Sequence, residues 1–198
     1  MSLTALLRKR RNVYGFLPKP VSDELLSGIL EDAIRVPSAG FTQDFDLVVV
    51  RNKSTKKRLA EASREEEYVK SNSALSDFIT TAPVLIVPCA NKQRYEAKYG
   101  RGVEGARLPW WLIDAGFVSL ALLLATFEKG LAASFLGAID DQMIAGILRL
   151  PDDGSIVPIA TIPLGYADPR EKPLWKGRYL KAKGKRRPLD DVVHWDTW

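Results

Sequence analysis

Residues 114 to 131 read DAGFVSLALLLATFEKGL, and this stretch decides the fold because it predicts one long apolar helix. One apolar stripe recurs at helical spacing and consists of Phe117, Leu120, Ala121, Leu124 and Phe127. A second apolar group covers much of the remaining helix surface and consists of Val118, Leu122 and Leu123. A helix that is apolar on most sides is expected to be central and buried. The apolar run from residue 115 to residue 127 is shorter than the roughly 18 residues of a membrane span, so we predict a core helix and no membrane partner.

The segments around this helix have the composition of strands. APVLIVPCA (82–90) precedes it, ASFLGAID (133–140) follows it, and IVPIATIPLGYADP (156–169) lies further along the chain. Each is rich in aliphatic residues and is expected to form a strand. Because proline cannot donate to a sheet ladder, Pro88 and Pro158 are expected at strand ends or irregularities.

Helices and strands also alternate in the N-terminal third of the chain. Ser22 is a suitable N-cap for a helix over residues 21–35, which ends near Pro37. A strand is expected over residues 46–51, and STKKRLAEAS (54–63) predicts a short helix. This alternation predicts an α/β or α+β layered structure, and we treat residues 1–198 as a single domain.

Composition narrows the class of protein further. With 46% hydrophobic and 27% charged residues, the chain has the balance of a soluble globular domain. A single cysteine and the lack of an apolar signal core near residue 1 predict a cytoplasmic location. Cys89 lies within an expected strand and is interpreted as a buried small hydrophobe. One cysteine and one histidine are too few for a zinc site, so no metal is expected.

The net charge of +5 is concentrated near the two ends of the chain. RKRR (8–11) and KAKGKRRP (181–188) are basic clusters of the kind that meets phosphate, nucleic acid, a membrane surface or only water. A basic nucleic-acid-binding module is therefore an alternative function. It is the weaker alternative because neither cluster belongs to a recognisable nucleic-acid motif.

Two segments fall outside the expected core. Residues 91–110 are polar and contain glycine, which predicts either a lid over a site or a solvent loop. Residues 168–198 have little periodicity but contain Trp175, Tyr179, Trp195 and Trp198. Aromatic residues on a tail without its own core predict that the tail wraps another surface, in its own domain or in a partner subunit.

Six short pieces follow one another in a consistent order from residue 7 to about residue 195. They are Arg10-Arg11-Asn12, PSAG (37–40) with Gln43, WWLIDAG (110–116), GLAASFLGAID (130–140), PLGYADP (163–169) and RRPLDDVVHW (186–195). This combination resembles the FMN-dependent nitroreductase family. The resemblance implies an α+β fold with a central, mostly antiparallel sheet flanked by helices. It also implies a homodimer with flavin at the interface and a C-terminal tail that crosses to the partner subunit.

The same resemblance implies which residues hold FMN. The phosphate and ribityl chain would be held by basic and polar residues near both ends: Arg10, Arg11, Asn12, Lys185 and Arg187. Arginine suits a phosphate dianion because its fork of donors binds two oxygens at once. Pro37, Ser38, Ala39, Gly40 and Gln43 would line the isoalloxazine ring. Leu136 and Gly137 would bring backbone near flavin N5, so no side chain is expected to act as nucleophile or obligatory acid.

Three positions depart from the family pattern. Tyr14 stands where many relatives have a cation, so the charge on reduced flavin would be met by a partner residue or tuned differently. Phe41 stands in place of an Asn and either stacks in the pocket or packs in a core. Asp44 stands in place of a Pro. His194, in the tail, is interpreted as a packing or surface residue.

The function implied is hydride transfer from NADH or NADPH through flavin N5 to a small electron-poor acceptor such as a nitroaromatic or quinone. The departures leave open another flavin reaction, such as dehydrogenation, dehalogenation or flavin breakdown.

Overall fold

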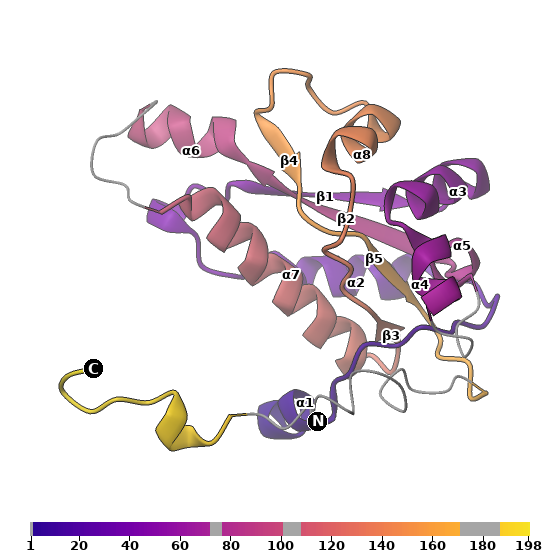
Figure 1. Cartoon of the computed structure of the whole chain (residues 1–198), viewed down its shortest axis with the longest axis horizontal. Helices are drawn as coiled ribbons and strands as arrows, with labels where there is room; N and C mark the ends of the chain where they lie inside the picture. Colours follow the sequence, from indigo (N-terminus) through magenta and orange to yellow (C-terminus); the bar gives the residue numbers. More distant parts are fainter. Residues whose placement is uncertain (1, 72–76, 101–107, 171–186) are drawn as a thin grey trace.

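The computed structural model describes residues 2–71, 77–100, 108–170 and 187–198. Within these ranges, the sheet is antiparallel throughout and helices cover both of its faces (Figure 1). The strands are β1 Phe45–Val50, β2 Val84–Asn91, β3 Ala132–Ala133, β4 Ile156–Pro158 and β5 Ile162–Gly165. They follow the order β1-β2-β5-β3, and β4 pairs with β2. The predicted α+β layered fold is confirmed.

Helices account for much of the rest of the described chain. They are α1 Leu3–Lys9, α2 Asp23–Ala33, α3 Lys53–Ala62, α4 Glu65–Ser71, α5 Phe78–Thr81, α6 Lys92–Tyr99, α7 Trp110–Glu128 and α8 Asp141–Leu148, with 3-10 turns η1 Ala39–Phe41 and η3 Leu189–Asp191. The expected cap of α2 is confirmed, because the Ser22 side chain accepts from the N–H of Leu25.

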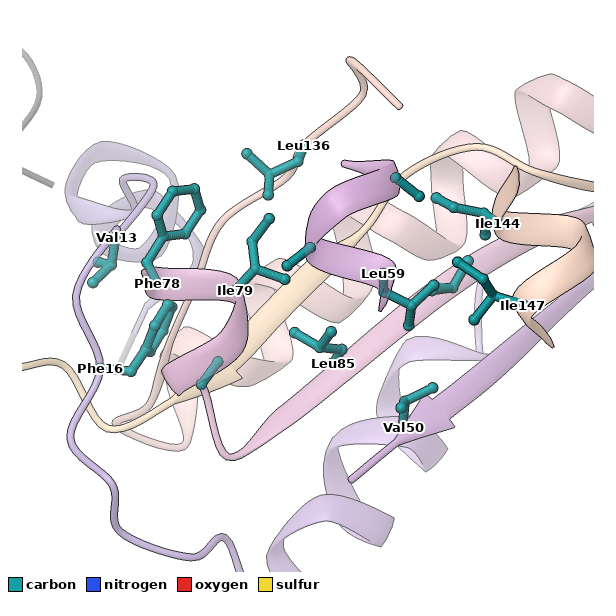
Figure 2. Close-up of a cluster of buried hydrophobic side chains, with 14 of the residues drawn as sticks. Val13, Phe16, Val50, Leu59, Phe78, Ile79, Leu85, Leu136, Ile144 and Ile147 are labelled. Atoms are coloured by element: carbon teal, nitrogen blue, oxygen red, sulfur yellow. The ribbon is translucent and has the colours of Figure 1, made fainter. Parts of the chain in front are cut away.

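Strand β2 separates two hydrophobic layers. Val84 and Ile86 pack with α2 and α7, whereas Leu85, Val87 and Cys89 pack with α3, α5 and α8 (Figure 2 shows the second layer). Every residue of β2 is buried, which explains its nearly continuous apolar sequence. Cys89 has no exposed surface, and burial raises the pKa of its thiol to about 12, so it is the inert hydrophobe expected.

Two prolines mark an irregularity in the centre of the sheet. Cys89 pairs with Pro158 and Ile86 pairs with Ile162, so three residues of the C-terminal strands face two of β2. This extra residue is a β-bulge, and it divides the predicted strand 156–169 into β4 and β5. The Pro88 carbonyl accepts from Ile159 on the bulged side, so the N–H that Pro88 lacks also faces the bulge. The predicted irregularity is confirmed.

The strand predicted over residues 133–140 is much shorter than expected. Only Ala132–Ala133 form β3, although the same register reappears where Leu136 pairs with Thr161. Ser134 lies opposite Pro163 in this register and donates to its carbonyl, but Pro163 has no N–H to return a bond. The ladder is therefore interrupted at Pro163 before it can extend to residue 140.

Helix α7 is central but buried on one face only, so the prediction of a buried helix is confirmed for the face under the sheet and wrong for the other face in the single chain. Val118 and Leu122 are buried under the sheet, whereas Phe117 is 42% and Leu120 is 48% exposed. With 19 residues and a mean hydropathy of 1.8, α7 has the length and composition of a membrane span. Its packing against α2 and β2 is that of a core helix in a layered domain.

The two segments expected outside the core differ in how much of them is described. Asn91 ends β2 and caps α6, while residues 101–107 lie outside the described ranges. In the tail, residues 171–186 lie outside them, including Lys185, Trp175 and Tyr179. All of residues 187–198 except Val193 are exposed, and they lie outside the layered body in Figure 1. Whether the tail crosses to a partner remains a prediction.

Candidate functional site

The basic residues after α1 lie against the end of β3. The N–H of Val13 donates to the carbonyl of Ala133 at 3.2 Å, which fixes the preceding residues at this edge of the sheet. Arg10 and Arg11 are half-buried, and their guanidinium groups donate to the side chain and the carbonyl of Asn12, each at 3.3 Å. A guanidinium has five donors in a planar fork, which is the geometry that suits an anionic ligand.

Tyr14 connects this segment to a firm support. Its hydroxyl accepts from the Asn12 amide at 3.3 Å, and its ring meets Phe78 edge-on with 5.1 Å between centroids. Phe78 lies on the one-turn helix α5, which is held from both sides by buried charged groups. Glu65 accepts from the N–H groups of Ile79 and Thr80 and from the Thr80 hydroxyl, while the Lys56 ammonium donates to the carbonyl of Ala82.

The segment after β3 joins the same edge of the sheet. Leu136 exchanges two backbone hydrogen bonds with Thr161, at 3.1 and 3.0 Å, so its N–H is already satisfied. Gly137 is exposed, and among the described residues its N–H has no acceptor. Figure 2 shows Leu136, Val13 and Phe78 at one end of the same hydrophobic cluster. Residues 10–12 and Gly137 together form what we call the arginine half-site.

The segment of residues 37–43, which we call the loop half-site, has a strained backbone. Gly40, Phe41 and Gln43 have φ angles of 53°, 59° and 49°, in the left-handed region that residues other than glycine rarely adopt. Ser38 accepts from the N–H of Gln43 at 2.9 Å, which closes the loop. Phe41 is 77% exposed, which excludes core packing within one chain. Strain of this kind concentrates at functional sites.

Helix α6 holds the outer side of this loop. The Arg94 guanidinium donates to the carbonyl of Thr42 at 3.0 Å, and the Lys98 ammonium donates to the carbonyl of Gly40. A Cβ atom at Gly40 would meet the hydroxyl of Tyr99. Position 40 therefore needs glycine for its φ angle, whereas the side-chain ends of Tyr99 and Lys98 beside it are flexible.

A pair of buried acids holds the inner side of the loop. Oδ2 of Asp114, at the start of α7, accepts from the N–H of Ala39 at 2.7 Å. Asp44 is fully buried beside Asp114, and among the described residues no donor reaches either oxygen of its carboxyl group. Burial, together with the neighbouring Asp114, raises the pKa of Asp44 to about 6. The sequence analysis did not predict this pair. The sequence signal that could have indicated it is an acidic residue beside each of two apolar runs, Asp44 before β1 and Asp114 in α7.

A hollow of about 510 Å³ opens beside the loop half-site. It lies between α2 and the edge strand β1, and Gln43 and Arg94 contribute to its wall. Residues 187–198 are the described part of the tail. There, Arg187 donates to the carbonyl of Asp191, and His194 stacks on Trp198 with 4.3 Å between ring centroids.

The comparisons with known proteins agree with this architecture. The model of the Nitroreductase family matches residues 7–166. The chain belongs to that family. A Thermus thermophilus protein named NADH dehydrogenase is 29% identical over 203 residues, which cover 94% of this chain and 92% of that protein. A Bacillus subtilis protein named FMN reductase is 22% identical over 97% of this chain and 72% of its own length.

A solved structure shares the whole fold. The nitroreductase family protein from Clostridium difficile 630 superposes with a TM-score of 0.75 and 25% identity, covering 100% of both chains. Membership of the Nitroreductase family assigns this chain to the oxidoreductases, as the resemblance of its six sequence pieces implied.

The two half-sites, expected around one flavin, are not brought together within one chain. The loop half-site contacts Asp114 in the first turns of α7, whereas the arginine half-site contacts β3, which follows the other end of α7. The 14 helical steps from Asp114 to Glu128 span about 21 Å. Figure 1 shows these two ends of α7 well apart, the first near α6 and the last near β3.

Proposed function

We propose that this protein is an FMN-dependent oxidoreductase that transfers hydride from NADH or NADPH to a small electron-poor acceptor, such as a nitroaromatic or a quinone. The observation that carries the proposal is the arginine half-site, in which two half-buried guanidinium groups lie on the same sheet edge as the N–H of Gly137, which has no acceptor among the described residues. Charged donors beside an uncommitted backbone donor fit a ligand with a phosphate at one end and a polar ring at the other.

Each group then has a defined role. Arg10 and Arg11, with Asn12, bind the phosphate and ribityl chain, and Lys185 and Arg187 of the tail add charge to that site. The Gly137 N–H donates to the ring near N5, and Leu136 supports it from the core because its own N–H stays in the sheet. Bound FMN supplies the hydride-accepting centre. The chain's own task is to orient the ring and limit its contact with water.

The loop half-site is supplied by a second copy of the chain. In a two-fold dimer every contact between the subunits occurs twice. If the arginine half-site of one subunit meets the loop half-site of its partner, the partner's arginine half-site therefore meets the loop half-site of the first. Pro37, Ser38, Ala39, Gly40 and Gln43 would then line the ring, with Phe41 exposed toward it. The apolar exposed face of α7, with Phe117 and Leu120, is suited to the interface. The tail would extend it by crossing to the partner.

The test of this function begins with an absorbance spectrum of the purified protein with and without FMN. Anaerobic NADH or NADPH should bleach the bound flavin, and a nitroaromatic or quinone should restore it. If flavin binds but NADH and NADPH do not bleach it, the enzyme uses another electron donor. Tyr14, which stands where many relatives have a cation, favours this second candidate. Failure to bind flavin would contradict both.

Mixing two damaged proteins tests the shared site directly. Arg10→Ala and Gly40→Val each damage a different half-site, so each homodimer should bind FMN poorly. In mixed dimers formed by refolding equal amounts together, one of the two sites has both half-sites intact. About a quarter of all sites should then recover, since half of the dimers are mixed. No recovery, with mixed dimers shown to form, would place the whole site in one chain.

A further inference from the structure

We infer that Asp44 and Asp114 share one proton, and that this proton holds the loop half-site in the conformation that receives the flavin ring. The inference rests on the proposed function and adds two positioning residues to it. Asp44 is completely buried and Asp114 is 1% exposed. Two ionised carboxylates cannot be accommodated side by side without water, so the site favours one proton between them.

The pair joins the two ends of the loop. Asp114 accepts from Ala39 at the start of η1, and Asp44 directly precedes β1, where its own carbonyl accepts from the N–H of Asn91 at 2.8 Å. A proton between the two carboxyl groups therefore links η1 to the sheet through α7. The loop needs such a link because Phe41 and Gln43 have unfavourable φ angles that surrounding contacts must maintain.

The other charged groups around the loop do not replace this proton. Arg94 and Lys98 of α6 donate to the carbonyls of Thr42 and Gly40, and Asp46 of β1 accepts from the Asn91 amide at 2.7 Å. The Thr42 hydroxyl donates to the carbonyl of Ala39. β2 contributes the neutral amide of Asn91. The raised pKa of Asp44 agrees with the geometry, since it has burial and the adjacent Asp114 as its first causes.

Flavin binding should consequently take up a proton. If the loop accepts the ring only while Asp44 is protonated, the binding-competent fraction falls about tenfold per pH unit above the pKa of Asp44. The dissociation constant for FMN should rise by the same factor. Because the coupling is reciprocal, bound FMN should raise the pH at which the pair loses its proton.

The experiment is calorimetric titration of the dimeric apoprotein with FMN between pH 5 and pH 8, in two buffers of different ionisation enthalpy. The wild type is compared with Asp44→Asn, which removes the ionisable group but can still donate to Asp114. Asp46→Asn is the matched control, because it makes the same chemical change two residues further along the chain. The FMN phosphate titrates near pH 6 as well, but its contribution is common to all variants and cancels.

We expect Asp44→Asn to bind FMN with a weaker dependence on pH and a smaller proton uptake than the wild type. Asp46→Asn should behave like the wild type. Equal proton uptake in wild type and Asp44→Asn would overturn the inference. If Asp44→Asn does not fold, Asp114→Asn serves instead, because its amide oxygen still accepts from Ala39. Without the second carboxyl group the pKa of Asp44 should fall, so the pH dependence of FMN binding should move to lower pH; an unchanged pH dependence would overturn the inference.

The failure of this inference is distinguishable from failure of the proposed function. If the wild type binds no FMN at any pH, the proposed function is wrong. Unfolding of the apoprotein as a function of pH then tests the shared proton alone. If the free energy of unfolding depends on pH in the same way in the wild type and in Asp44→Asn, the inference of a shared proton is wrong as well.

Discussion

The two half-sites are built in opposite ways. The arginine half-site is held by the backbone hydrogen bond from Val13 to Ala133 of β3 and by the contact of the Tyr14 ring with Phe78, so its guanidinium groups are not needed to maintain its shape. The loop half-site has three left-handed residues and is held by side chains: Arg94 and Lys98 outside, Asp114 inside. Side-chain changes should therefore remove ligand contacts at the first half-site and change backbone conformation at the second.

The largest expected effect comes from separating the half-sites altogether. Leu120→Asp places a charge on the exposed apolar face of α7, and in a two-fold interface each dimer carries two such charges. Burying them should weaken the dimer by on the order of 4 kcal/mol, roughly a thousandfold. Sedimentation should show monomers, and FMN binding should be lost with them.

Glu128→Gln, at the polar end of the same helix, is the control and should remain dimeric. A monomeric Leu120→Asp protein that still binds FMN with the affinity of the wild type would contradict a site shared between subunits.

The next effect distinguishes the half-sites by their response to pH. The pKa of Asp44 is raised from 3.8 to about 6, so the unfolded state ionises first as pH rises. The free energy of unfolding should fall by about 3 kcal/mol between pH 4 and pH 6, at about 1.4 kcal/mol per pKa unit, and then level off. Urea unfolding of the apoprotein measures this change. Asp44→Asn should abolish most of it, whereas Arg10→Ala should leave it in place.

A smaller effect is expected at the arginine half-site. Arg10→Ala should weaken FMN binding by about 2 kcal/mol, roughly thirtyfold, because a charge-assisted bond to the phosphate is lost. Stability should change little, since the segment is held by backbone bonds. Riboflavin, which lacks the phosphate, should bind the variant and the wild type equally. Arg8→Ala, on the exposed side of α1, is the control; a similar loss there would indicate a general effect of charge.

The sequence was sufficient for the elements with strong local signals. Ser22 and the apolar period after it placed α2, and the prolines marked the bulge beside Pro88. The sequence was insufficient where the pairing or the exposure of a residue depends on a segment far away in the chain. Pro163 interrupts the strand predicted after residue 133, and the exposed side of α7 follows from which face the sheet covers.

The candidate site shows the same limit. The motifs indicated Arg10 and Gly40 as ligand residues, but nothing local in the sequence separates them to opposite ends of a helix. Asp44 and Asp114 are 70 positions apart, so no spacing rule connects them. Their pairing is a consequence of how η1 packs on α7, which only the folded chain contains.

The smallest expected effect tests whether strain in the loop half-site has a measurable cost. Gly40→Ala should destabilise the protein and weaken FMN binding by about 1 to 2 kcal/mol, the cost of a left-handed alanine. The contacts near position 40 are the flexible ends of Lys98 and Tyr99, which can move aside. Gly28→Ala, in α2 with no atom within 4 Å of the new Cβ, should instead stabilise the protein by about 0.5 to 1 kcal/mol. Thermal unfolding of both variants measures the difference. If the melting temperatures of both variants shift in the same direction, the left-handed backbone at position 40 does not determine the stability of the loop half-site.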